Sequence, residues 1–231
     1  PPLASAEGLG DLYAYTWPEP RTDFAALGAQ AARRRATTDR ALILNLEVGF
    51  LHQAQFMRGF DRWLMDLAAD TSFAGALMDA ILEIWLVEAG ATIQAVGDCA
   101  DVVVYADDIA FQDRPVFSTA MYRKLIRPRQ HRVFDLLDQS GMKVFYHSCG
   151  NVRPLIADMV EMGVDILNPV QVSAAGMGDT AALKAEWGDM LTFWGGIDTQ
   201  AVLPRGSTGE VRREVMRRLD DLARSGGYVL A

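Results

Sequence analysis

The sequence has few residues of several kinds, and each scarcity excludes a class of protein. Two cysteines among 231 residues cannot form a disulfide framework, so we expect these thiols to be buried, catalytic or metal-bound. No apolar run reaches the ~18–20 residues of a membrane span, and no signal-peptide pattern opens the chain. The formal net charge of −8 argues against a nucleic-acid-binding surface. We therefore expect a cytoplasmic protein that binds neither nucleic acid nor membrane.

What the chain does contain is a regular alternation of short apolar strands and helices. Half of the residues are hydrophobic and 23% are charged, which is typical of an ordinary globular domain. The pattern predicts six buried strands, at 42–46, 102–105, 143–146, 165–167, 191–194 and 228–230. It predicts helices at 23–35, 122–138 with an interruption at Pro128, 152–162, 180–187 and 208–224. Repeated βα units imply a parallel sheet that helices cover.

Two apolar stripes at helical spacing lie between the first two strands. The first is Phe56, Phe60, Leu64 and Leu67. The second is Phe73, Leu77, Ile81 and Trp85, with Ser72 as the expected N-cap. Residues 1–22 are turn-rich and contain Trp17-Pro18-Glu19-Pro20, so we expect a linker or an extended surface segment there.

The alternation fits either a doubly wound sheet or a (β/α)8 barrel. No glycine-rich phosphate loop follows the first strand, which weakens the dinucleotide-binding alternative. A barrel needs about 250 residues. The chain starts without Met and stops at 226–231, where a strand is just beginning, so we expect a fragment; a short C-terminal edge strand is the alternative. The prediction is one (β/α)8 barrel domain over 1–231, truncated at both ends, with about six of its eight strands present.

Polar or glycine-rich turns follow the predicted strands. In chain order, these turns contain Glu47, Asp107 and Asp108, His147 and Cys149, Asn168 and Gln171, and Asp198. Ligands of parallel α/β folds bind at the carboxyl ends of strands, so we expect a small-molecule site of an enzyme here. The adjacent Asp107 and Asp108 face opposite ways, so that one points into the site and the other can cap a helix. Asp198 either contributes to the site or only organises its turn.

His147 and Cys149 are the most specific pair in this set. Residues i and i+2 at a strand end point to the same side, and an imidazole with a thiolate suits Zn²⁺ better than Mg²⁺ or Ca²⁺. A zinc site needs a third protein ligand, for which Glu47, Asp108 or a residue beyond Ala231 is available. The alternative is a small buried Cys149 beside a hydrogen-bonding His147.

Longer motifs around these residues resemble the uroporphyrinogen decarboxylase superfamily. The matching segments are Asp107-Asp108-Ile109, His147-Ser148-Cys149-Gly150, 163–171, 193–200, 202–204 and 226–228. The match is strong from residue 100 to the end and is traceable earlier at Arg58-Gly59-Phe60. The resemblance implies a (β/α)8 barrel with its site at the carboxyl-end mouth.

That superfamily includes two chemistries. Its decarboxylases remove acetate carboxyls from a tetrapyrrole without a metal, whereas its corrinoid-dependent methyltransferases carry zinc on a His-x-Cys pair and a distant third ligand. The chain is more similar to the second branch, because it has His147-Ser148-Cys149 and because 168–171 replaces the decarboxylases' Asp-Trp turn. Phe56 also stands about where the decarboxylases have a substrate-contacting Tyr.

The resemblance therefore implies zinc-dependent methyl transfer. It implies His147 and Cys149 as zinc ligands, a third ligand beyond Ala231, a corrinoid as methyl carrier and a thiol or similar acceptor, with a corrinoid protein as a partner. The residues expected to bind a small-molecule substrate or to orient the ligands are Asp108, Asn168, Gln171 and Asp198. Two alternatives stay open: a tetrapyrrole decarboxylase, with Arg153 as the nearest basic residue, and a protein that holds a corrinoid or porphyrin without chemistry.

Overall fold

The computed structural model describes the backbone of residues 1–231 and every side chain except that of Glu47. The chain divides into two compact units, each described here by itself. The first unit comprises residues 1–107 and 139–142, and the second comprises 108–138 and 143–231. The prediction of one domain over 1–231 stays a prediction.

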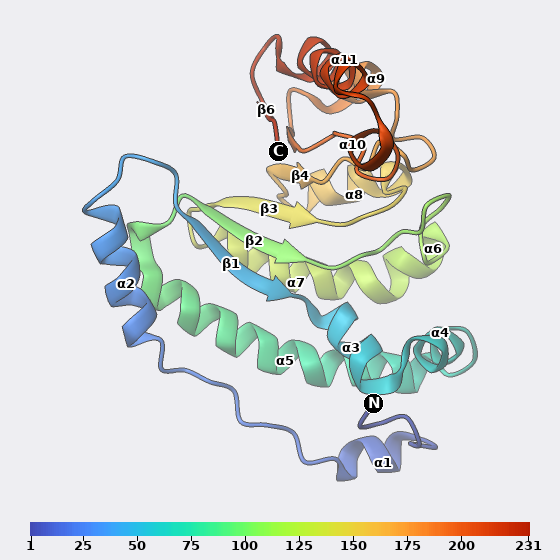
Figure 1. Ribbon diagram of the computed structural model, residues 1–231. Coiled ribbons are helices and arrows are strands. Elements are labelled where there is room, and N and C mark those ends of the chain that lie inside the picture. Colours follow the sequence, from blue (N-terminus) through green and yellow to red (C-terminus); the bar gives the residue numbers. More distant parts are fainter. The chain divides into compact units, whose positions relative to one another are not determined.

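The first unit is a helical layer with a pair of parallel strands. Strands β1 (Ile43–Val48) and β2 (Val102–Ala106) pair so that Ile43 lies opposite Val102. Its helices are α1 (Leu9–Ala14), α2 (Ala25–Arg35), α3 (Phe50–Arg58), α4 (Phe60–Ala69) and α5 (Thr71–Val96), followed by the turn η1 (Gly97–Cys99). The long α5 contacts each of the other four helices and so forms the centre of this layer (Figure 1).

Helix α5 confirms the second predicted stripe. Phe73, Leu77, Ile81 and Trp85 are all buried. The expectation for Ser72 is wrong, because the residue that caps this helix is Asp70, whose Oδ1 accepts a hydrogen bond from Phe73 N at 3.0 Å. Asp70 lies at the position from which a carboxylate reaches the free N–H groups of the first turn.

The first predicted stripe is wrong, because a glycine divides it between two helices. Gly59 has a φ of +88°, a left-handed value that ends α3 and lets α4 start in a new direction. Phe56 and Phe60 are consequently 63% and 43% exposed, while Trp63 and Leu67 are buried. A periodicity that continues through a glycine thus does not mark one helical face here.

Residues 1–22 are not an extended segment throughout. They include α1, and Leu3 and Leu12 are buried. The guanidinium of Arg58 donates to the carbonyl oxygens of Leu3 at 2.7 Å and Ala6 at 2.8 Å, and the same group pairs with the carboxylate of Asp66 at 2.6 Å. These backbone contacts attach the start of the chain to α3.

The second unit is a parallel sheet with alternating helices (Figure 1). Strands β3 (Lys143–His147), β4 (Ile166–Asn168), β5 (Thr192–Trp194) and β6 (Tyr228–Val229) pair in chain order, with His147 opposite Asn168. The helical segments are α6 (Thr119–Met121), η2 (Tyr122–Ile126), α7 (Arg127–Asp138), η3 (Arg153–Leu155), α8 (Ile156–Glu161), α9 (Thr180–Trp187), α10 (Val202–Arg205), α11 (Thr208–Arg218) and η4 (Leu219–Ala223). All six predicted strands therefore form, each within two residues of its predicted ends.

The predicted interruption of the 122–138 helix lies just before the proline. Residues Tyr122–Ile126 form a π-helical turn, and α7 begins at Arg127 with Pro128 in its first turn, where a missing N–H does no harm. A fully buried hydrogen-bond chain joins this helix to β3: Tyr122 Oη donates to Gln130 Oε1 at 2.7 Å, and Gln130 Nε2 donates to Tyr146 Oη at 2.9 Å. These hydrogen bonds hold β3, the strand that ends at His147, against the helix.

Helix length and hydropathy also bear on membrane insertion. Among the described residues, none of the helices combines the length and the apolar character that crossing a bilayer requires.

Candidate metal centre

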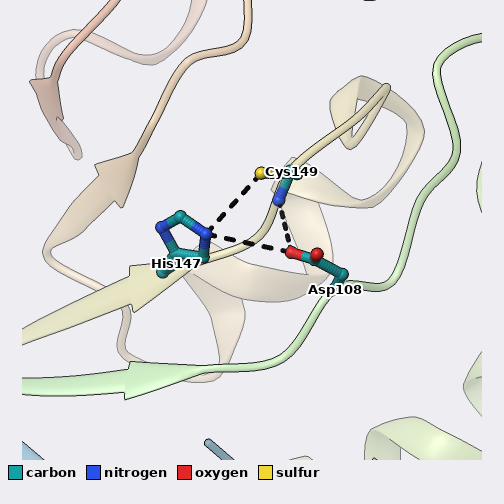
Figure 2. A group of neighbouring side chains, drawn as sticks. All are labelled: Asp108, His147 and Cys149. Atoms are coloured by element: carbon teal, nitrogen blue, oxygen red, sulfur yellow. Dashed lines mark hydrogen bonds and ion pairs between the residues drawn. The ribbon is translucent and has the colours of Figure 1, made fainter. Parts of the chain in front are cut away.

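Three side chains with metal-binding chemistry converge in the second unit. Asp108, His147 and Cys149 each offer one ligand atom, and these atoms all lie within 4.8 Å of one another (Figure 2). His147 ends β3, and Cys149 follows two residues later. His147 Nε2 lies 3.6 Å from Cys149 Sγ and 3.9 Å from Asp108 Oδ1. We call these three residues the metal cluster.

The spacing of the His147–Cys149 pair fits zinc. With Zn–S near 2.3 Å and Zn–N near 2.05 Å, a tetrahedral angle separates sulfur and nitrogen by about 3.6 Å. The Sγ to Nε2 distance is 3.6 Å. The Nε2 to Asp108 Oδ1 distance of 3.9 Å is longer than the tetrahedral value of about 3.4 Å. Nitrogen, sulfur and oxygen donors together are a usual set for Zn²⁺.

Asn168 determines which ring nitrogen of His147 faces the metal cluster. The Asn168 Nδ2 group donates to the carbonyl oxygen of Trp194 at 3.0 Å, so the amide oxygen points the other way. That oxygen lies 2.6 Å from His147 Nδ1, which therefore carries the hydrogen and donates it. The lone pair of Nε2 is then left facing Cys149 and Asp108, as metal ligation requires.

Cys149 is held in place, and its surroundings disfavour the thiolate when no cation is bound. Its backbone N–H donates to Asp108 Oδ1 at 2.7 Å. Burial raises the pKa of the Cys149 thiol, and the carboxylate of Asp108 raises that pKa further. A cation bound between the two groups would reverse this balance, because it stabilises the thiolate directly.

The remaining predicted site residues have other contacts. Gln171 Oε1 accepts from Gly150 N at 2.8 Å, and its Nε2 donates to Gln112 Oε1 at 2.7 Å. Asp198 Oδ1 accepts from the backbone N–H groups of Gln200 and Ala201, both at 2.8 Å, and so organises the turn after β5. Asn168 alone of these contacts the metal cluster directly. The assignment of Asp108, Asn168, Gln171 and Asp198 to substrate binding stays a prediction.

Asp107, the neighbour of Asp108, has a structural role in the first unit. Its fully buried carboxylate accepts from the backbone N–H groups of Leu51 at 3.1 Å and His52 at 2.9 Å, at the start of α3. It also accepts from the hydroxyl of Tyr105. Asp107 therefore has the helix-capping role considered from sequence, while the role of Asp108 in the site stays a prediction. Glu47, the other candidate third ligand, has a side chain outside the described residues.

Two contributors were not found by sequence reasoning. Gln112 holds the amide of Gln171, and the available signal was only its position four residues after Asp108. Trp194 contributes its backbone carbonyl oxygen, which no side-chain pattern reveals.

Comparison with known proteins decides the family. The sequence model of the uroporphyrinogen decarboxylase (URO-D) family matches residues 18–231. The chain belongs to the URO-D family. This confirms the predicted resemblance, and no curated protein matches the chain.

Among solved structures, a methyltransferase from Methanosarcina mazei is similar to this URO-D family chain. The TM-score is 0.69 at 18% sequence identity, and the alignment covers 94% of this chain and 64% of the methyltransferase. The chain thus spans less than two thirds of that protein's length. At this identity the likeness concerns the fold, and together with the family match it confirms the predicted α/β fold of the barrel class.

Proposed function

We propose that this URO-D family chain is an enzyme of zinc-dependent methyl transfer, with the metal cluster as its metal site. The observation that carries the proposal is the convergence of His147 Nε2, Cys149 Sγ and Asp108 Oδ1 within 4.8 Å of one another. Three protein ligands and one open position are what a catalytic zinc site requires. In this proposal Asp108 supplies the third donor, which the resemblance alone placed beyond Ala231.

Bound zinc would lower the pKa of a coordinated substrate thiol, so that the thiol is nucleophilic at neutral pH. The chain's own residues prepare this site. Asn168 directs Nε2 of His147 toward the metal cluster by accepting the hydrogen of Nδ1. Cys149 gives up its thiol proton when it becomes a ligand. Asp108 supplies negative charge and, through the N–H of Cys149, stays against the loop.

The methyl donor and the acceptor follow from the resemblance rather than from the contacts of this chain. A methyl-corrinoid, carried by a partner corrinoid protein, would supply the methyl group, and a small thiol would accept it. The protein would bring the two together at the carboxyl ends of the strands.

Decarboxylation of a tetrapyrrole is less well supported. An anionic tetrapyrrole needs cationic side chains, and the nearest candidate from sequence was Arg153. Its guanidinium already donates to the Gly176 carbonyl oxygen at 3.1 Å and pairs with Glu186 at 3.0 Å. The acidic and amide groups around the metal cluster favour a cation over a polycarboxylate.

The proposal is tested with the purified protein, methylcobalamin and a small thiol. We expect thiol methylation that needs zinc, that stops after chelation, and that His147→Ala abolishes. His131→Ala is the matched control, because this exposed histidine pairs with Asp135 on the surface of α7. Activity that survives chelation or His147→Ala would contradict the proposal. Metal-free conversion of uroporphyrinogen to coproporphyrinogen would support the decarboxylase instead.

A further inference from the structure

Three consecutive backbone N–H groups hold the loop that carries Cys149. The donors are the N–H groups of residues 149, 150 and 151. Their acceptors are, in order, Asp108 Oδ1 at 2.7 Å, Gln171 Oε1 at 2.8 Å and the Phe111 carbonyl oxygen at 2.8 Å. The first and third acceptors belong to the segment at 108–111, whereas Gln171 belongs to the turn after β4. The loop is therefore held by two separate parts of the second unit.

The middle residue of this loop has no free space. Gly150 has a φ of +87°, and a Cβ atom there would lie 2.5 Å from the carbonyl oxygens of both Ala110 and Phe111. The backbone thus packs directly on the neighbouring segment. Any displacement of Gly150 would move the adjacent Cys149 with it.

Gln171 is oriented toward Gly150 by a second amide. Its Nε2 donates to Gln112 Oε1 at 2.7 Å, and Gln112 Nε2 in turn donates to the Ser173 carbonyl oxygen at 2.6 Å. These bonds assign the nitrogen and oxygen ends of both amides, so the oxygen of Gln171 faces the Gly150 N–H. Both polar ends of Gln171 are thereby engaged by the protein.

We propose that Gln171 is a positioning residue that holds Cys149 Sγ in register with His147 Nε2 and thereby sets the metal affinity of the metal cluster. It acts through the N–H of Gly150 and does not touch the metal itself. The reason is entropic: a loop already fixed in the ligating geometry loses less conformational freedom when the metal binds. This inference rests on the proposed function, since it presumes that the cluster binds zinc.

The first test measures zinc affinity by chelator competition in three variants. Gln171→Met removes both hydrogen-bonding ends at similar volume, Gln171→Glu keeps an acceptor for Gly150, and Gln200→Met is the matched control. The side-chain amide of Gln200 bonds to the amide of Gln112 in both directions at 3.4 Å, whereas its backbone bonds to Asp198 and Arg205. We expect Gln171→Met to raise the zinc Kd about 10–100-fold, with Gln171→Glu and Gln200→Met within about threefold of the wild type. Affinity that is unchanged in Gln171→Met would overturn the inference.

The second test uses the metal-free protein and so separates this inference from the proposed function. We expect the amides of residues 149–151 to exchange with solvent at least about tenfold faster in Gln171→Met than in the wild type. Unchanged exchange overturns the inference whatever the metal does. If the wild type binds no zinc while exchange rises in Gln171→Met, the proposed function fails and the ordering of the loop by Gln171 stands.

A further variant covers the case in which Gln171→Met does not fold. Gln112→Met leaves the Gln171 to Gly150 bond possible but removes the partner that orients the amide. We expect a smaller rise of the zinc Kd, about 3–10-fold, and faster exchange at residue 150. Wild-type affinity together with wild-type exchange in Gln112→Met would overturn the inference.

Discussion

The side-chain oxygen of Asn168 lies 2.6 Å from Nδ1 of His147, across the paired ends of β4 and β3. Because the other end of the amide donates to Trp194, this contact selects one tautomer of the imidazole. The polar arrangement around the metal cluster thus depends on strand pairing in the second unit, and it gives the first prediction.

Asn168→Leu is expected to raise the zinc Kd about 10–100-fold, the usual effect of removing the hydrogen-bond partner of a metal-binding histidine. Asn168→Asp keeps an acceptor at Nδ1 and should retain most of the affinity. Nitrogen NMR of the metal-free protein checks the mechanism. His147 should carry its hydrogen on Nδ1 in the wild type, whereas in Asn168→Leu the hydrogen should exchange between Nδ1 and Nε2. Equal zinc affinity in the wild type and Asn168→Leu would contradict the account.

The second prediction concerns the Cys149 thiol in the metal-free protein. Asp108→Asn removes the negative charge that adds to the effect of burial on the thiol pKa, so that pKa should fall. The rate of alkylation by iodoacetamide, followed against pH in a Cys99→Ala background, should therefore reach its midpoint at lower pH. Asp113→Asn is the control, because that exposed carboxylate pairs with Arg114. A midpoint that stays or moves to higher pH in Asp108→Asn would show that the carboxylate has no such influence.

The second prediction extends to zinc binding, whose affinity should rise with pH. Because the Cys149 thiol releases its proton on becoming a ligand, zinc affinity is expected to rise about tenfold per pH unit below the thiol pKa. Isothermal titration in buffers of different ionisation enthalpy counts the released proton. No proton release at neutral pH would mean that the thiol is not the ligand.

The third prediction compares two glycines with the same backbone conformation. Gly150 and Gly163 have φ values of +87° and +88°, but a Cβ would meet backbone oxygens only at Gly150. Gly163→Ala should cost about 1–2 kcal/mol of unfolding free energy from the left-handed conformation alone. Gly150→Ala should cost more, about 3 kcal/mol or above, because the segment at 110–111 must also move. Urea denaturation measures both, and equal losses would show that the close approach has no energetic consequence.

The fourth prediction compares a buried ion pair with an exposed one. Arg58 and Asp66 have side chains only 7% and 15% exposed, whereas Lys143 of the Lys143–Asp165 pair is 69% exposed. Arg58→Met should destabilise the protein by about 3–5 kcal/mol, since it leaves Asp66 uncompensated and frees two carbonyl oxygens. Lys143→Met should cost about 0–1 kcal/mol. Thermal unfolding of both variants measures the two losses of stability. A smaller loss of stability in Arg58→Met than in Lys143→Met would contradict the role assigned to the Arg58–Asp66 pair.

Sequence reasoning located the strands because buried parallel strands are short apolar runs bounded by turns. Val102-Val103-Val104-Tyr105 and Lys143-Val144-Phe145-Tyr146 both show this pattern, and both form strands. The break at Gly59 could not be predicted from periodicity, because the apolar spacing continues across it. The buried start of the chain was missed as well, since Arg58 binds it through backbone carbonyls.

The candidate site was predictable only where the spacing of residues along a strand determines the direction of their side chains. His147 and Cys149 lie two residues apart at a strand end, which is enough to bring them together. The approach of Asn168 depends on the register between β3 and β4, and the approach of Gln171 depends on the path of the turn after β4. Neither is encoded in a short segment of sequence. For the same reason, sequence left Asp108 as one of several candidate third ligands.

The metal content of the purified protein tests the central claim most directly. We predict about one zinc per chain in the wild type and in Cys99→Ala, and less than about a tenth of that in Cys149→Ala. Cys99→Ala is the matched control, because it removes the other free cysteine, which lies in the first unit. Substoichiometric zinc in the wild type that is unchanged in Cys149→Ala would contradict the account.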